Sequence, residues 1–215
     1  MTTRHVIVAA AVAAGLSIPR VAAAQPPAPV QSGAEAVQAA EAPLLVRVGA
    51  PGAARVLTVF CDLEEDACAR LVLVLRTVQA SRSSDLAVVF RHLAREDHRQ
   101  SALGYRAALA AAAQGKGWEM LDLVLANGEH LHDEGLRGMG TQLGLDVGRL
   151  SADTAADAVS KVLEDDARDA KGLKVEGVPA LFLDGKRLPD LFTYDAIVAA
   201  LKQGGPAHGP APTVP

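Results

Sequence analysis

The sequence has few aromatic residues and no excess of positive charge, and each shortage excludes a class of function. Only 3 % of its 215 residues are Phe, Trp or Tyr, so it cannot supply the several exposed rings on which single-stranded nucleic acid stacks. The formal net charge is −4 and no cluster of Lys and Arg stands out, whereas proteins bind phosphate backbones through such clusters. We therefore predict no nucleic-acid partner.

Motifs that hold cofactors are also absent. The sequence contains no Gly-rich phosphate loop, no nucleophile elbow and no zinc motif. The pair His130-x-His132, followed by two acidic residues, could supply metal ligands. It lies next to a turn sequence, Asn127-Gly128, and we interpret it as a solvated loop. The sequence thus predicts no cofactor and no metal.

The one long apolar run lies at the N-terminus, and residues 1–24 are typical of a secretory signal peptide. Arg4 precedes an apolar run from Val6 to Ile18, and Ala22–Ala24 is a small-residue cleavage site. The run is shorter than the roughly 20 apolar residues that span a bilayer. We predict a secreted or periplasmic protein that begins at Gln25, with no membrane insertion after cleavage; the alternative is a retained interfacial helix.

Composition divides the rest of the chain into three parts. Residues 25–43 are rich in Ala and Pro and predict an extended linker, and residues 204–215 predict a disordered tail. Half of all residues are hydrophobic and 21 % are charged, which is typical of a packed domain. We expect that domain to occupy residues 44–203.

The pattern of the domain predicts a mixed sheet covered by helices. Expected strands are Arg55–Phe60, Leu86–Phe90 and Ala180–Leu183, the last followed by the turn Asp184-Gly185 and a returning strand. In Cys68–Gln79 the apolar spacing fits a helix, although its central LVLVL also fits a strand. Further helices are expected at Ser101–Ala113, Trp118–Ala126, Leu136–Leu143, Thr154–Lys171 and Tyr194–Leu201. The acidic run Glu164–Asp166 is typical of a solvated helix face.

Cys61 and Cys68 are the only cysteines. In an oxidising compartment two thiols of one domain often pair, and two cysteines allow one intramolecular bridge. Two alternatives stay open at this point. Cys68 could be a free buried residue in helix packing, or it could act as a monothiol or bond to another chain.

Four stretches, in this order, resemble the DsbA-like disulfide oxidoreductases of the thioredoxin fold. They are Phe60–Cys68, Val89–Leu93, Ala110–Met120 and Gly177–Arg187. The resemblance implies an α/β fold with a thioredoxin-like mixed sheet, helices on both faces and an inserted helical subdomain at about residues 100–150. His92 and His98 lie in or near the second stretch, and we interpret them as structural.

The first stretch departs from the family at the residues that carry its chemistry. The attacking cysteine of the family falls on Glu65 and the proline after it on Asp66, whereas the resolving cysteine is retained as Cys68. A buried acid that moves protons in many members falls on Val59. Disulfide exchange needs a thiolate, so the resemblance implies that the dithiol cycle is lost.

The last stretch is the family's cis-proline segment. The resemblance implies that the Val178–Pro179 bond is cis, that it faces the start of the Cys68 helix, and that the backbone before it pairs with an extended peptide. The alternative is that this proline only shapes the sheet edge. We expect a redox-degenerate module that binds peptides or unfolded client proteins around Glu65, Val178 and Pro179. The alternative function is an oxidoreductase that works through Cys68 alone or through a Cys61/Cys68 pair.

Overall fold

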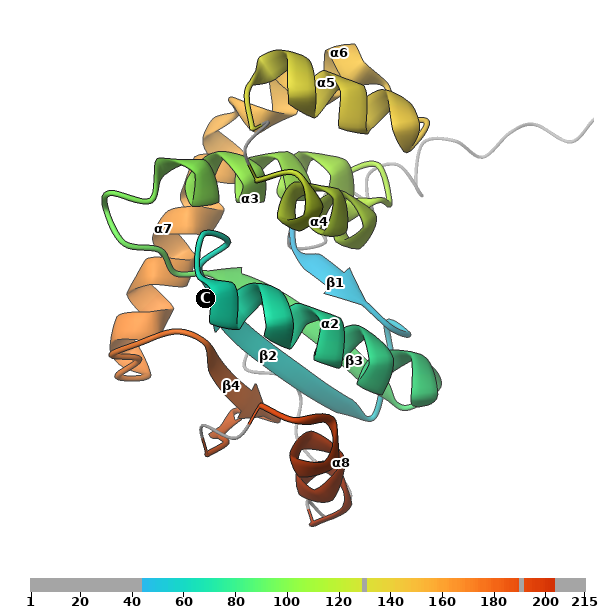
Figure 1. Ribbon diagram of the computed structural model, residues 1–215, viewed down its shortest axis with the longest axis vertical. Helices are drawn as coiled ribbons and strands as arrows, with labels where there is room; N and C mark the ends of the chain where they lie inside the picture. The colour runs from blue at the N-terminus through green and yellow to red at the C-terminus, as the bar shows by residue number, and fades with distance from the viewer. Residues whose placement is uncertain (1–43, 129–130, 190–191, 204–215) are drawn as a thin grey trace, which may run out of the picture. The chain divides into compact units, whose positions relative to one another are not determined.

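In the computed structural model, residues 44–128, 131–189 and 192–203 are described (Figure 1). The predicted signal peptide, the linker 25–43, the tail 204–215 and His130 lie outside these residues. Within them, no helix combines the length and the apolar character that crossing a bilayer requires.

A mixed sheet forms the centre of the domain, as the sequence predicts. Its five strands lie in the order β1-β3-β2-β4-β5; β2 and β3 are parallel, and the other neighbours are antiparallel. The strands are β1 (Val46–Val48), β2 (Arg55–Cys61), β3 (Leu86–His92), β4 (Ala180–Leu183) and β5 (Lys186–Arg187). The short β1 was not expected, because three residues are too few to show an alternating pattern.

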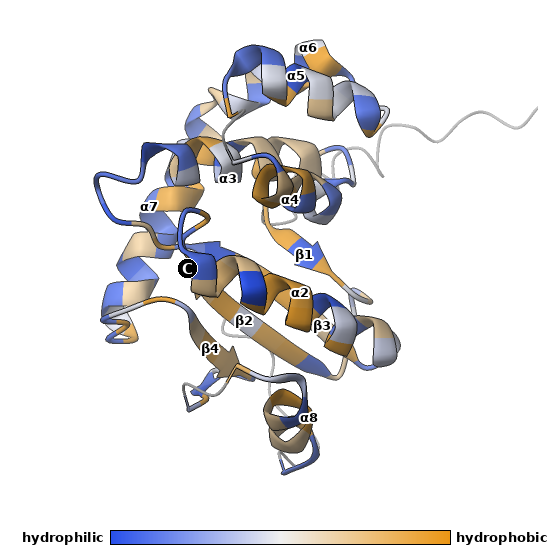
Figure 2. Cartoon of the chain, in the orientation of Figure 1, coloured by the Kyte–Doolittle hydropathy of each residue, from blue (hydrophilic) through white to orange (hydrophobic). Residues whose placement is uncertain are grey.

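The two central strands are apolar because helices cover both faces of the sheet. Leu57, Val59 and Cys61 of β2 pack into the larger hydrophobic cluster, whereas Phe60 packs into a smaller one with Ala170. This alternation places the two clusters on opposite faces. Figure 2 shows mostly hydrophobic residues along β1 and β2 and a mostly hydrophilic segment between β3 and α3. The expected thioredoxin-like fold with helices on both faces is confirmed.

Seven helices fall within the described ranges. They are α2 (Asp66–Ser81), α3 (Arg99–Ala112), α4 (Gly117–Ala126), α5 (Asp133–Gln142), α6 (Val147–Thr154), α7 (Asp157–Gly172) and α8 (Tyr194–Gln203). The ambiguous segment after Cys68 is therefore helical. It buries Cys68, Leu71, Leu75 and Val78 on one face, the spacing of an amphipathic helix.

Two helix starts differ most from the prediction, and N-caps account for both. The segment expected to start a helix at Thr154 instead ends α6, which begins after Asp146, whose carboxylate accepts the N–H of Arg149. Helix α5 begins before Leu136 because His132 caps it by accepting the N–H of Gly135. Side-chain caps satisfy N–H groups that a helix start leaves unpaired.

Helix α7 is fixed to β3 by a buried ion pair, where the sequence predicted a solvated acidic face. Asp166 is buried and bonds to Arg91 Nε at 2.5 Å, and it also accepts the backbone N–H of His92 at 2.8 Å. Burial raises the pKa of Asp166, although Arg91 opposes that rise. Lys161 and Asp165, on the same helix, are paired near the surface. The prediction was wrong for Asp166 because sequence charge alone does not show which position of a helix faces the sheet.

Helix α3 approaches its neighbours closely at Gly104. A Cβ atom there would lie 2.5 Å from Cγ1 of Val124 and 3.2 Å from Cδ1 of Leu63. Val124 belongs to α4, and Leu63 lies in the connection between β2 and α2. Gly104 therefore lets α3 pack against both α4 and this connection.

Candidate functional site at the ends of β2 and β3

The residues singled out in the sequence converge at one edge of the sheet. Cys61 at the end of β2 is paired in register with His92 at the end of β3, and Phe60 with Ala180 at the start of β4. The connection from β2 to α2 and the connection from β3 to α3 both leave from this edge. Residues distant in the sequence therefore share one site.

Cys61 and Cys68 form a disulfide at this edge, with their Cα atoms 5.6 Å apart. Both residues are fully buried. The backbone N–H of Asp62 donates to Cys68 Sγ at 3.3 Å. Of the three alternatives for Cys68, the structure therefore has the intramolecular bridge, and no thiol remains in the oxidised chain.

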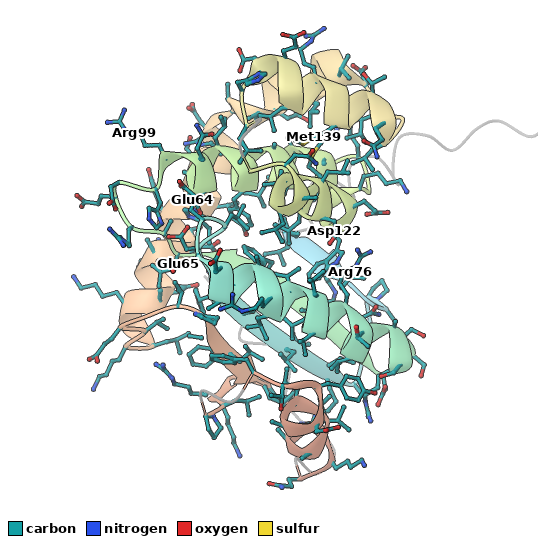
Figure 3. All side chains as sticks on the ribbon, in the orientation of Figure 1. Glu64, Glu65, Arg76, Arg99, Asp122 and Met139 are labelled. Carbon is teal, nitrogen blue, oxygen red and sulfur yellow. A yellow bond between two sulfur atoms is a disulfide. The ribbon has the colours of Figure 1, made fainter. Side chains whose placement is uncertain are left out.

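Glu65 occupies the N-cap of α2, the position that the resemblance assigns to the attacking cysteine. Its backbone is extended and its side chain makes no capping hydrogen bond. Glu65 is half-buried, whereas Glu64 and Asp66 on either side are exposed. Figure 3 labels Glu64 and Glu65 near the start of α2. A carboxylate is favoured at a helix N-terminus because the dipole there is positive.

The Val178–Pro179 peptide bond is cis. Strands β2 and β4 pair antiparallel with Phe60 opposite Ala180. Continuing this register by one residue places Pro179 opposite Cys61. The segment thus lies beside the strand end that the disulfide ties to α2. Pro179 is buried and Val178 is half-buried.

Asp62 is a buried carboxylate that organises the loop between β2 and α2. Its Oδ1 accepts the N–H of Glu64 at 3.0 Å, and its Oδ2 accepts the N–H of Arg95 at 3.2 Å and Nδ1–H of His98 at 2.6 Å. Burial alone would raise the pKa of Asp62, but hydrogen bonds from Glu64, Ser101, His98 and Arg95 hold it below its usual value. The carboxylate therefore stays ionised although it is fully buried.

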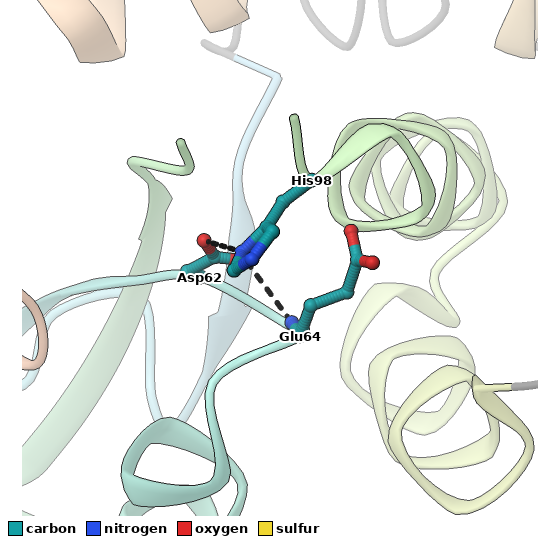
Figure 4. Close-up of side chains that lie close together, drawn as sticks. All are labelled: Asp62, Glu64 and His98. Carbon is teal, nitrogen blue, oxygen red and sulfur yellow. Dashed lines mark hydrogen bonds and ion pairs between the residues drawn. The ribbon is translucent and has the colours of Figure 1, made fainter. Parts of the chain in front are cut away.

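His98 lies between two carboxylates. Its hydrogen bond to Asp62 raises the pKa of His98, and the charges of Asp62 and Glu64 add to the rise. Glu64 Oε2 in turn accepts the N–H of Ser101 at 2.9 Å, in the first turn of α3. Figure 4 shows Asp62, Glu64 and His98 close together.

His92 lies on the buried side of the same network and behaves in the opposite way. Its ring stacks on the ring of Tyr105 with the two ring centroids 5.3 Å apart, and its Nε2 lies 3.2 Å from Oγ of Ser101. Burial lowers the pKa of His92 to about 4. His92 is therefore neutral near physiological pH, whereas His98 favours the charged form.

Sequence reasoning treated both histidines as structural and did not join His98 to Asp62 and Glu64. A usable signal was present. The carboxyl ends of adjacent parallel strands meet at one edge of a sheet, so the residues that follow Cys61 and His92 are brought together.

Fold and strand-end site together define a thioredoxin-like protein of the disulfide oxidoreductase type. A family model described as DSBA-like thioredoxin domain matches residues 67–202. The chain belongs to that family, as the resemblance implied.

The chain is also similar to known proteins in sequence and in fold. The chain is 34% identical over 151 residues to the Na(+)/H(+) antiporter NhaA of Herminiimonas arsenicoxydans. The aligned region covers 69% of this chain and 24% of that protein. It therefore spans about a quarter of the length of this curated relative. A thioredoxin-like oxidoreductase from Silicibacter pomeroyi superposes with a TM-score of 0.63 at 22% identity, over 75% of this chain and 95% of that one. The catalytic domain of Proteus mirabilis ScsC superposes with a TM-score of 0.62 at 21% identity, over 79% of this chain and 94% of that one.

Proposed function

We propose that this chain is an exported, peptide-binding relative of the DsbA-like oxidoreductases that does not exchange disulfides. One observation carries the proposal: the only two cysteines form a bridge with both residues fully buried. Exchange requires a thiolate to reach a sulfur atom. No sulfur of the oxidised native chain is accessible to a protein substrate.

The residue at the start of α2 supports the same conclusion. Glu65 places a negative charge where a thiolate would be stabilised by the helix N-terminus. A carboxylate can hold a charge or accept hydrogen bonds there, but it forms no mixed disulfide. The neighbouring Val59 is fully buried among apolar residues, so no acid on this part of β2 serves proton transfer.

Peptide binding is supported by the backbone beside the bridge. Among the described residues, nothing bonds to the backbone N–H or C=O of Val178. Val178 lies one residue beyond Pro179, at the end of the ladder between β2 and β4. Unpaired backbone groups at the end of a ladder can pair with an extended peptide.

A second function, a dithiol made of Cys61 and Cys68, is favoured by the bridge itself, because these two residues are the ones joined. Burial of both opposes it. A thiol count on the native chain after mild reduction separates the two functions. A dithiol enzyme would release two thiols without denaturant, whereas the structural bridge would release them only in denaturant.

Binding is tested with a reduced and alkylated protein that stays unfolded, labelled with a fluorophore. We expect the wild type to bind this probe and Glu65→Lys to bind it with changed affinity, since Glu65 is the N-cap of the helix that the disulfide ties to the end of β2. Glu164→Lys makes the same charge change on the exposed face of α7 and should leave binding unchanged. Turnover of model disulfides by the wild type would reject the proposal. It would also be rejected if both variants bound the probe equally and if a peptide probe with an N-methylated backbone bound as well as an unmethylated one.

A further inference from the structure

Three potential metal ligands converge beyond the ends of β2 and β3. One ligand atom from each of Asp62, Glu64 and His98 lies within 4.8 Å of the other two (Figure 4). Asp62 and Glu64 belong to the loop after β2, and His98 is the N-cap of α3. The set holds one imidazole nitrogen and two carboxylate oxygens, a mixture that suits zinc and neighbouring transition metals.

No guanidinium forms an ion pair with the two carboxylates within the described residues, although the charge of Arg95 acts on Asp62. The side chain of Arg95, whose backbone bonds to Asp62, turns to Asp97 with Nη2 2.8 Å from Oδ2. Arg99 extends away from Glu64 (Figure 3). The only cationic partner in the cluster is therefore the proton on His98 Nδ1.

The surrounding backbone orients the three groups. The N–H groups of Glu64 and Arg95 fix the carboxylate of Asp62, and the N–H of Ser101 fixes Oε2 of Glu64. The other oxygen of Glu64, Oε1, has no hydrogen-bond partner among the described residues. Such supporting hydrogen bonds are what holds metal ligands in place.

The cluster also has one closed side and one open side. Asp62 is fully buried, the side chain of His98 is 18 % exposed, and Glu64 is exposed. A bound ion would be held from within by Asp62 and would keep access to water. Three protein ligands with a free position are typical of an open transition-metal site.

We propose that Asp62, Glu64 and His98 bind one divalent transition-metal ion of the zinc type. The ion replaces the proton that now lies between His98 Nδ1 and Asp62 Oδ2, and that proton passes to solvent. The two atoms are 2.6 Å apart, whereas two ligands of one tetrahedral zinc ion lie about 3.3 Å apart. A small rotation of the His98 ring provides the difference, since no other hydrogen bond holds that ring among the described residues.

The test uses the full chain without a histidine tag, with its disulfide intact, after removal of metal by a chelator. Titration with Zn²⁺ alone near neutral pH should show one ion per chain. His98→Asn should weaken binding at least about tenfold, and Asn suits the N-cap position that His98 occupies. Glu64→Gln should also weaken it. His132→Asn is the matched control, because His132 is likewise a helix N-cap and Asn can cap there; it should leave binding unchanged.

Co²⁺ provides a second measurement. Bound through nitrogen and oxygen it should give visible absorption without the intense near-ultraviolet bands of thiolate ligands, because both sulfurs are in the bridge. The proposal is overturned if Zn²⁺ and Co²⁺ do not bind, if folded His98→Asn binds as the wild type does, or if His132→Asn weakens binding equally. Should His98→Asn fail to fold, Glu64→Gln at an exposed position decides the outcome in the same way.

Discussion

The connection between β2 and α2 has an inner side and an outer side with opposite character. The inner side contains Cys61, Asp62 and Cys68, all fully buried, and joins them through a disulfide and hydrogen bonds. The outer side contains Glu64, Glu65 and Asp66, of which only Glu64 uses its side chain in a hydrogen bond within the described residues. Under the proposed function, this difference means that the buried framework of the site is kept while the residue at the start of α2 is replaced.

The largest effect should come from restoring sulfur on the outer side. We expect Glu65→Cys with Asp66→Pro, in a Cys61→Ser background, to change the chain from inactive to measurably active in disulfide exchange. The introduced thiol would lie at the N-cap of α2 and could pair with Cys68, and Pro is favoured at the first position of a helix. Turnover of a model disulfide measures the gain, which should be slow because Val59 carries no proton.

Cys61→Ser alone is the control for that experiment. It frees Cys68 but leaves Glu65 in place, so we expect no turnover. Robust turnover by this single variant that disappears with Cys68→Ser would show a working monothiol and would remove the distinction between the two sides.

The inner side should be the more costly one to disturb. Asp62→Ala leaves the N–H groups of Glu64 and Arg95 and the ring of His98 without their acceptor. Loss of a buried charge partner costs about 3 kcal/mol, so urea unfolding should show a drop of that order. Asp66→Ala, at an exposed position, should change the free energy of unfolding by only about 0.5 kcal/mol. Equal losses would contradict the comparison.

His92 and His98 allow the buried and the more exposed side of the site to be compared through the pH dependence of stability. His92 has a pKa of about 4 in the folded chain against 6.5 for the unfolded reference. Its neutral burial contributes stability above pH 6.5, which is lost as pH falls toward 4. The shift corresponds to about 3 kcal/mol at about 1.4 kcal/mol for each pKa unit. Urea midpoints across this range should fall for the wild type and fall less for His92→Asn.

His98 acts in the opposite direction. Its pKa is raised by Asp62, so its contribution is fully present below the unfolded value of 6.5 and is lost as pH rises through the higher folded value. His98→Asn should therefore remove a loss of stability on the alkaline side and leave the acidic loss caused by His92. If both variants changed the same part of the pH curve, the assignment of the two histidines would be wrong.

The smallest of the expected effects is removal of the bridge. Cys61→Ala with Cys68→Ala opens a loop closed over a sequence separation of 7 residues. A loop that short predicts a loss of about 2.5 kcal/mol. Unfolding with and without reductant measures it: reductant should lower the stability of the wild type in denaturant and leave the double variant unchanged.

The sequence predicted the central strands and the family, because these depend on local pattern and on motifs with fixed order. Periodicity left the segment after Cys68 open between helix and strand. The sequence did not predict β1 or helix α6. Strand β1 is three residues long, and α6 depends on a cap at Asp146 whose partner is the N–H of Arg149. Both are too short for hydrophobic periodicity to appear.

In the site, the resemblance predicted Glu65, Cys68, Val178 and Pro179, because the family motifs mark these positions, and their functional role stays a prediction. The cluster of Asp62 and Glu64 with His98 was not, since 34 residues or more separate the loop from the helix start. Only the parallel pairing of β2 with β3 brings them together. The partial burial that decides their charges, likewise, is a property of the packed fold.

The close approach at Gly104 has a consequence for how such a chain can change over generations. A methyl group at that position would collide with Val124 on one side and press on Leu63 on the other, so any side chain at position 104 requires Val124 to shift. By contrast, Glu65 and Asp66 on the outer side make no side-chain hydrogen bond within the described residues, so their side chains can change without breaking a contact. Substitutions at this edge of the domain are thus confined to residues of its outer side. A new chemistry can arise there while the packing of the fold stays the same.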